Sequence, residues 1–285
     1  MDKQIAIVTD SNSGIFPTQA EEMGVHTVPM PFCVDGNWMY EGKDLSQREF
    51  YQLQQQGATI TSSQPAPQDI TDLWDTLLQE YETIVYIPMT SGLSGSTATA
   101  IALAQEYNGR VQVVDNRRIS LTQLQSIRDA QTMVGKGMSA QQIKDTLEQE
   151  GSKASIYLAA DTLKYLKKGG RITPAAAAIG TVLNIKPVLQ IQGGGVDAFA
   201  KVRGLQAAMR TMLEAMEKDL TVRFAGVSMR LGVAYSGDPE SAKAWYEMVQ
   251  QRFPGYEVEF APLSLSIGCH TGPGTLCIGC YSYYE

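Results

Sequence analysis

The sequence predicts an α/β protein in two parts: a three-layer αβα domain with a mainly parallel sheet, then an α+β domain with a mixed or antiparallel sheet. Short apolar runs alternate with helical segments as far as Glu150, which is typical of parallel strands covered by helices on both faces. Beyond that point, two apolar runs joined by three glycines at 193–195 indicate an antiparallel hairpin. We place the boundary at Gly151-Ser152, which gives domains 1–152 and 153–285.

The elements of the first domain follow from local signals. Pro17 at a first turn and Gly24 just past the end predict a helix, and Ser46 and Glu49 have the spacing of a capping box. The predicted strands cover 5–8, 25–34 (an edge strand broken by two prolines), 37–40, 84–87 and 111–114, and the predicted helices cover 17–23, 46–56, 67–81, a stretch from Ser96, 121–134 and 139–150. Residues 59–67, T-I-T-S-S-Q-P-A-P, are predicted as a hydroxyl-rich loop.

The elements of the second domain are predicted from the same kinds of local signal. The predicted strands cover 155–159, 185–192, 196–202, 231–235 and 256–262, and the predicted helices cover 163–168, 174–183, 204–220 and 239–253. The chain closes with a glycine-rich loop, C-H-T-G-P-G, and the strand-like run T-L-C-I-G-C-Y. No internal repeat interrupts this order.

Composition excludes several classes of function. The 285 residues carry 23 Lys plus Arg against 30 Asp plus Glu, a formal net charge of -7, which argues against a nucleic-acid or anionic-membrane surface. No apolar stretch is long enough to span a bilayer, and the first residues lack the pattern of a signal peptide. We therefore expect a cytoplasmic protein with no integral membrane segment, whose four cysteines are thiols.

The loop S-G-L-S-G-S between the strand at 84–87 and the next helix is a candidate anion site. Gly92 and Gly95 permit unusual backbone angles, and the free amides of the helix would meet a carboxylate together with hydroxyls such as Ser94. The same residues could simply cap the helix. Asp10, Ser62 and Asp115 are predicted on loops at the same carboxyl edge of the sheet, where ligands bind in such folds.

His270 is the second candidate, because the glycines around it allow close approach of a ligand. Ser94, Asp115 and His270 would follow the chain order of an α/β-hydrolase triad, so a serine hydrolase or acyltransferase using Ser94 is the alternative function. Its weakness is Ser96, which stands where the nucleophile elbow needs a second glycine.

Zinc is a further alternative, with Cys269, His270, Cys277 and Cys280 as the ligand set. Cys277 and Cys280 fall in a strand-like run, where residues three apart face opposite sides. A second C-x-x-C, a P-loop and a dinucleotide fingerprint are missing. We therefore predict no metal, no cofactor and no nucleotide site.

Taken together, the motifs resemble those of the DegV family, from T-D-S at Thr9 to the C-terminal G-P-G. The matching pieces are T-D-S, S-S-Q-P at 62–65, S-G-L-S-G at 91–95, V-V-D at 113–115, Y-L-K-K-G-G-R-I at 165–172, I-K-P-V-L at 185–189, K-V-R-G at 201–204 and H-T-G-P-G at 270–274. The family usually has Thr where this chain has Ser62, and Ser where it has Asn116.

The resemblance implies a non-enzymatic protein that binds one long-chain fatty acid between its two domains and presents the carboxylate to a separate ATP-dependent fatty acid kinase subunit. The carboxylate would bind hydroxyls at Ser62 and Ser94, with His270 nearby and Thr61 or Ser63 able to share the hydrogen bond. Arg171 and Arg203 would contact the kinase or the acyl phosphate.

Overall fold

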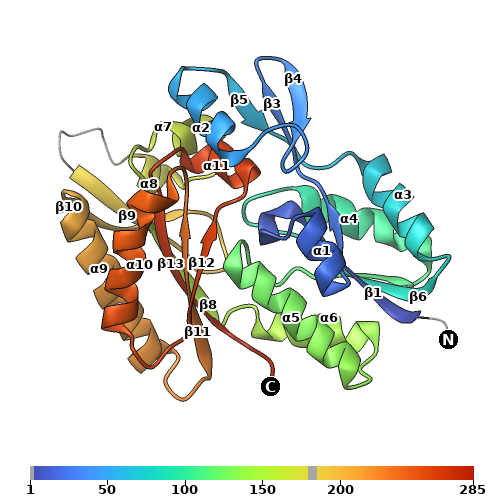
Figure 1. Ribbon diagram of the computed structural model, residues 1–285. Helices are drawn as coiled ribbons and strands as arrows, with labels where there is room; N and C mark the ends of the chain where they lie inside the picture. The colour runs from blue at the N-terminus through green and yellow to red at the C-terminus, as the bar shows by residue number, and fades with distance from the viewer. Residues whose placement is uncertain (1–2, 179–184) are drawn as a thin grey trace.

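The computed structural model describes residues 3–178 and 185–285 (Figure 1). The first half contains β1 (Lys3–Asp10), η1 (Ser11–Ser13), α1 (Pro17–Met23), β2 (His26–Val28), β3 (Pro31–Val34), β4 (Asn37–Tyr40), α2 (Gln47–Gln55), β5 (Ile60–Ser62), α3 (Pro67–Leu77), β6 (Tyr81–Ile87), α4 (Ser96–Ala104), η2 (Gln105–Tyr107), β7 (Val111–Val113), α5 (Leu121–Gly135) and α6 (Ala140–Glu150). The second half contains β8 (Ala154–Ala159), α7 (Lys164–Gly169), α8 (Pro174–Ala177), β9 (Ile185–Ile191), β10 (Asp197–Arg203), α9 (Leu205–Lys218), the π-helical turn η3 (Asp219–Arg223), β11 (Met229–Tyr235), α10 (Pro239–Arg252), β12 (Val258–Pro262), α11 (Leu265–Thr271) and β13 (Leu276–Ser282).

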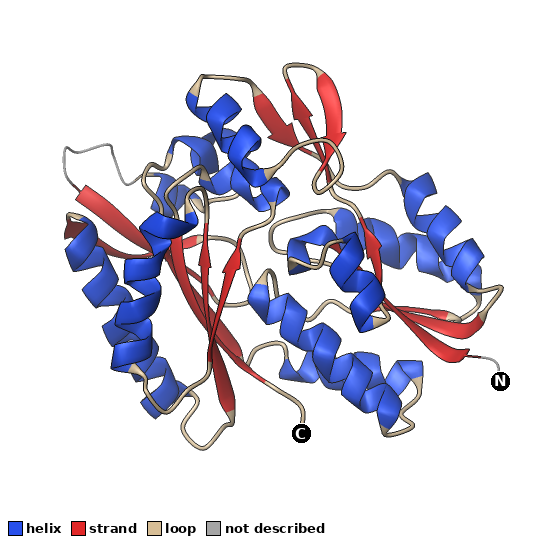
Figure 2. Ribbon diagram, in the orientation of Figure 1, coloured by secondary structure: helices blue, strands red, loops and turns tan. Residues whose placement is uncertain are grey.

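The first half is built on a parallel sheet with strand order β2-β1-β6-β7. On one face, Ala6 and Tyr86 pack with Trp74 of α3. On the other, Ile7 and Val85 belong to the cluster of α5 and α6. This confirms the three-layer αβα prediction (Figure 2).

The second half is built on a six-stranded mixed sheet, β10-β9-β8-β13-β11-β12, in which only β11 and β12 pair in parallel. One face is covered by α9 and α10. The other face turns toward α5 and shares one core cluster with the parallel sheet. The predicted α+β half is therefore confirmed, whereas the boundary between 152 and 153 stays a prediction.

A third, three-stranded sheet, β4-β3-β5, was not predicted. The expected edge strand at 25–34 is two strands: β2 pairs with β1, and β3 is the centre of the small sheet. The turn Asp35-Gly36 has positive φ at both residues, as a two-residue hairpin turn of type I′ requires. The loop predicted at 59–67 was wrong at its start, because Ile60–Ser62 pairs with Phe32–Val34 as β5.

Two further predictions concern the helix expected at 174–183 and the loop expected around His270. The helix expected at 174–183 is present as α8 up to Ala177, and residues 179–184 lie outside the described residues. The glycine-rich loop expected around His270 was wrong in part, because His270 lies in α11. Gly272 follows that helix with a φ of 72°.

Candidate functional site

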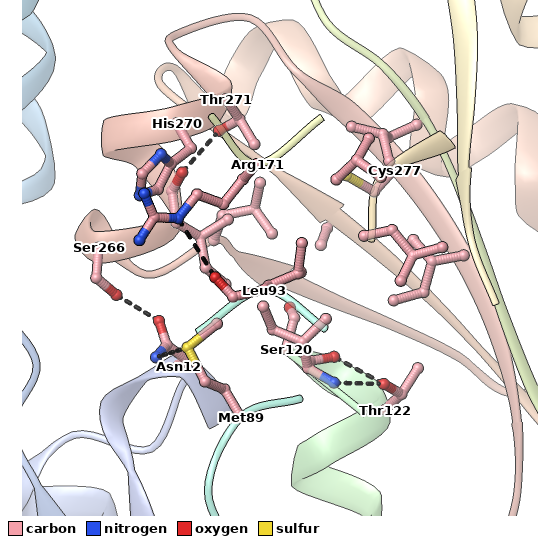
Figure 3. A pocket seen from close by; sticks show the side chains of 18 of the residues that line it. Asn12, Met89, Leu93, Ser120, Thr122, Arg171, Ser266, His270, Thr271 and Cys277 are labelled. Atoms are coloured by element: carbon pink, nitrogen blue, oxygen red, sulfur yellow. Dashed lines mark hydrogen bonds between the residues drawn. The ribbon is translucent and has the colours of Figure 1, made fainter. Parts of the chain in front are cut away.

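One large cavity lies between the halves of the chain, enclosed by the N-terminal end of α5, the mixed sheet, α11 and the loop before α4 (Figure 3). It holds about 970 Å³ of space between atoms, open solvent at its mouth included. Its wall is almost entirely apolar, with Met30, Met89, Leu158, Ile191 and Leu263 among the lining residues. An apolar wall with a few polar groups is typical of small-molecule binding sites.

The floor of the cavity is a trough in the mixed sheet. Successive side chains of a strand face opposite sides, so Cys277, Gly279 and Tyr281 of β13 face the cavity, as do Gly232 and Ala234 of β11. Gly232 and Gly279 are direct partners across the two strands. Two glycines side by side leave a depression where other residues would fill the space.

Polar side chains gather at the other end, beside α11. Ser62, the last residue of β5, and His270 on α11 place Oγ and Nε2 2.6 Å apart. Both are partly buried, and both line the cavity. They come from segments 208 residues apart, so only the folded chain brings this pair together.

The imidazole of His270 is neutral at pH 7. Burial, and then the positive charge of Arg171, lower its pKa from 6.5 to about 4. Its Nδ1 atom is buried and has no hydrogen-bond partner among the described residues, and it lies against Gly169, where any side chain would collide with it. A proton on Nε2 would be donated to Ser62 Oγ and would leave the hydroxyl proton of Ser62 free for an acceptor in the cavity.

Arg171 lies at the mouth of the cavity, where its side chain is exposed. Its Nε donates to the carbonyl of Leu93 at 3.3 Å and its Nη1 to that of Gly169 at 2.6 Å. Within the described part of the chain, no carboxylate forms an ion pair with it. The mouth therefore carries a positive charge that no carboxylate of the described residues pairs with. A second, open depression next to it is lined by 91–95, 170–173 and Gly195.

Ser94 also lines the cavity, in the loop before α4. Its Oγ accepts the amide of Ser96 at 3.1 Å, a capping contact at the first residue of the helix. The hydroxyl proton of Ser94 is not used in that bond and is available to an acceptor in the cavity. The unusual backbone angles expected at Gly92 and Gly95 are absent, since neither has a positive φ and Gly95 is right-handed helical with a φ of -74°.

The helix α11, which carries His270, is held by residues of the first half. Glu41 accepts the amide of Leu265 at 2.6 Å through Oε2, and Gln54 Nε2 donates to the carbonyl of Gly268 at 3.2 Å. Burial raises the pKa of Glu41 from 4.5 to about 8. Glu41 was not predicted from the sequence, since a lone carboxylate just after a hairpin carries no local signal.

Asn12 is a second residue that was missed. It is buried, lines the cavity and accepts hydrogen bonds from Ser264 Oγ at 3.1 Å and from Ser266 Oγ. In the sequence, the motif T-D-S-N at 9–12 indicates only a turn. Asp10, in the same motif, is buried and accepts the amides of Met89 at 2.7 Å and Asn12 at 3.0 Å, so it anchors this loop outside the cavity lining.

The other predicted site residues divide into two groups. Ser63 lines the cavity beside Ser62. Thr61 is exposed and does not line it, because alternation along β5 turns it outward, so of the two residues expected to share the carboxylate bond it is Ser63 that borders the cavity. Ser62 itself lies in the small sheet and not at the carboxyl edge of the parallel sheet. Arg203 is exposed at the end of β10, outside the cavity lining.

The triad of the alternative function is not assembled. His270 bonds Ser62 through Nε2, its Nδ1 has no partner among the described residues, and Asp115 accepts the amide of Ser91 at 3.3 Å. A general base for Ser94 would need hydrogen-bond contact with its hydroxyl and an orienting acid behind it.

The geometry also gives no support to the zinc set. Cys277 faces the cavity, whereas Cys280 packs on the opposite face of the sheet with α9 and α10. In the described ranges, 3–178 and 185–285, no three metal-binding side chains converge. All four cysteines are free thiols. No helix in these ranges has the length and apolar character needed to cross a bilayer.

Comparisons with known proteins give one consistent match. The family model described as "Uncharacterised protein, DegV family" matches residues 4–283. A DegV domain-containing protein of Deinococcus radiodurans is 32% identical over 274 residues, 95% of this chain and 96% of that protein. One of Streptomyces coelicolor is 30% identical over 278 residues, 97% of this chain and 98% of that protein.

Solved structures agree over the same length. A DegV family protein of Thermus thermophilus, described by its fatty acid binding, has a TM-score of 0.87 and 31% identity, covering 98% of this chain and 99% of that one. DegV of Bacillus subtilis, described as a fatty acid binding protein, has a TM-score of 0.86 and 26% identity with the same coverage.

Proposed function

The chain belongs to the DegV family, and on this premise we propose that it is a carrier that binds one long-chain fatty acid in the cavity. The carboxylate would bind the hydroxyls of Ser62 and Ser94, with His270 holding Ser62 through its Nε2 proton, and the acyl tail would lie in the trough of β11 and β13. The observation that carries the proposal is the form of the cavity, whose surface is mostly apolar and which has the hydrogen-bonded pair Ser62 and His270 at the end beside α11.

The apolar part of the cavity supports the tail. Each methylene removed from water contributes about 0.8 kcal/mol, and the wall offers Leu158, Ile191 and Leu263 with no charged group at the trough. A polar ligand of the same size would lose hydrogen bonds to water there without replacing them. A long unbranched chain is the ligand that this shape favours.

The polar end supports a carboxylate head group. Because His270 is neutral at pH 7, it can donate from Nε2 to Ser62, whose own proton is then free for the ligand. Ser94, in the loop before α4, supplies a further hydroxyl. Hydrogen bonds to an ionised group are about twice as strong as neutral ones. The positive charge of Arg171 at the mouth favours an anion over a neutral head group.

We further propose that the bound carboxylate is presented to a separate ATP-dependent fatty acid kinase subunit. The open depression beside the mouth supports this, since its glycines let another chain approach the head group and Arg171 borders both spaces. Arg203 would then act at the surface, away from the lipid. The chain has no P-loop or dinucleotide fingerprint of its own.

The test is mass spectrometry of an organic extract of the purified protein, together with the native mass of the intact complex. We expect one fatty acid per chain. A protein that is isolated empty, and that takes up neither palmitate nor oleate, would contradict the carrier function while leaving the fold unaffected. The kinase step is tested separately, by acyl phosphate formation that requires this protein, the kinase subunit and ATP together.

A further inference from the structure

The far end of the trough is formed by Leu121, Gly232 and Tyr281. β13 starts next to α11 and runs away from it (Figure 1), so Tyr281 lies roughly 14 Å beyond Cys277 at about 3.4 Å per residue. Gly232 lies between them on β11, opposite Gly279. Leu121, the first residue of α5, reaches this point from the other wall.

Leu121 sits directly on Gly232. A β-carbon at Gly232 would lie 2.5 Å from Leu121 Cδ1 and 3.1 Å from the hydroxyl of Tyr281. No side chain larger than that of glycine therefore fits under Leu121 without a shift. The leucine side chain therefore lies over the Gly232 side of the trough and narrows it at this point.

Charged groups lie behind this closure. The hydroxyl of Tyr281 donates to Glu259 Oε1 at 3.0 Å, and the same oxygen forms an ion pair with Arg128 at 2.7 Å. An apolar tail that passed Tyr281 would have to break this contact and leave a polar group unpaired. Tyr281 is thus a fixed end wall, whereas Leu121 is held by apolar packing alone.

We propose that Leu121 sets the longest acyl chain that this protein accepts, an inference that rests on the proposed fatty acid binding. In Leu121→Ala, the loss of Cγ and both Cδ atoms would open the space between Gly232 and Tyr281 to the end of a longer tail. Leu121 would select for chain length by its position in the trough, and not through a polar contact with the ligand.

The experiment is a series of binding assays with saturated fatty acids from laurate to arachidate. We expect Leu121→Ala to move the preferred length upward, with a relative gain of about fourfold for each methylene that the new space admits. Leu213→Ala is the matched control, because Leu213 is a helical leucine of equal burial, 9% exposed against 8%, on the opposite face of the mixed sheet. It should keep the wild-type length profile.

Gly279→Ala provides an independent test if Leu121→Ala folds poorly. A β-carbon there would lie 3.4 Å or more from its nearest neighbours, Ser155 O, Ile156 and Thr122, so it fits and narrows the trough. We expect it to favour shorter chains. Fatty acid binding with unchanged length profiles in Leu121→Ala and Gly279→Ala would overturn this inference alone. Absence of fatty acid binding in the wild type would overturn the proposed function, and the inference with it.

Discussion

Replacing Ser62 with alanine tests the head-group site most directly. Ser62 Oγ lies 2.6 Å from His270 Nε2, and in the proposed complex its proton is donated to the carboxylate. Losing a hydrogen bond to a charged group costs about 1.5–3 kcal/mol, so the Kd for palmitate should rise roughly ten- to 150-fold. For a fatty alcohol of the same length, the neutral bond predicts a loss of only about two- to tenfold.

Thr61→Ala is the matched control, since Thr61 precedes Ser62 on the same strand but is exposed and does not line the cavity. Isothermal titration calorimetry or displacement of a fluorescent fatty acid gives both affinities, and thermal unfolding confirms that the variants are folded. If Ser62→Ala and Thr61→Ala bind palmitate equally, the assignment of the carboxylate to Ser62 is wrong.

Three further predictions concern the rest of the site. Ser94→Ala should raise the Kd for palmitate by at least about tenfold, because its hydroxyl also donates to the ionised carboxylate, and an unchanged Kd measured by the same titration would remove Ser94 from the site. Arg203→Ala should keep the wild-type Kd and lower acyl phosphate formation with the kinase subunit, whereas Arg171→Ala should weaken both because Arg171 lines the mouth; loss of lipid in Arg203→Ala would contradict its surface role. Glu41 keeps its proton in the folded state up to about pH 8 but loses it near pH 4.5 when unfolded, so its contribution makes unfolding easier as pH rises through that window. His270 acts in the opposite direction between pH 4 and 6.5, so the comparison is made above that range. Between pH 6.5 and pH 8 the free energy of unfolding, measured with urea, should fall in the wild type but not in Glu41→Gln. An equal change in both proteins would contradict the burial of an uncharged Glu41.

Helix starts that depend on neighbouring residues were predicted correctly from the sequence. The capping box at Ser46 and Glu49 is present with both reciprocal bonds, and Pro67 opens α3 as its position suggested. By contrast, β5 spans only Ile60–Ser62 and exists because it pairs with β3. α11 contains Gly268 within seven residues, and a helix so short depends on tertiary contacts rather than on propensity.

The candidate site shows the same division. Hydroxyls and glycines in the sequence pointed to Ser62, Ser94 and His270, all of which line the cavity. Which of them touch could not be read from the sequence, because Ser62 meets His270 only through the packing of the small sheet on α11. The trough could not be predicted from the sequence either, since it depends on Gly232 lying opposite Gly279.

The attachment of α11 to Glu41 and Gln54 has a consequence for the lifetime of the protein. The helix that carries His270 is held by the first half of the chain, so an unfolded or half-folded chain has no head-group site and cannot retain a fatty acid. A ligand that binds only the folded chain raises the free energy of unfolding by RT ln(1 + [L]/Kd). On the proposed function, a cell short of free fatty acid would hold more of this protein empty, and the empty chains would be the ones that proteases remove first.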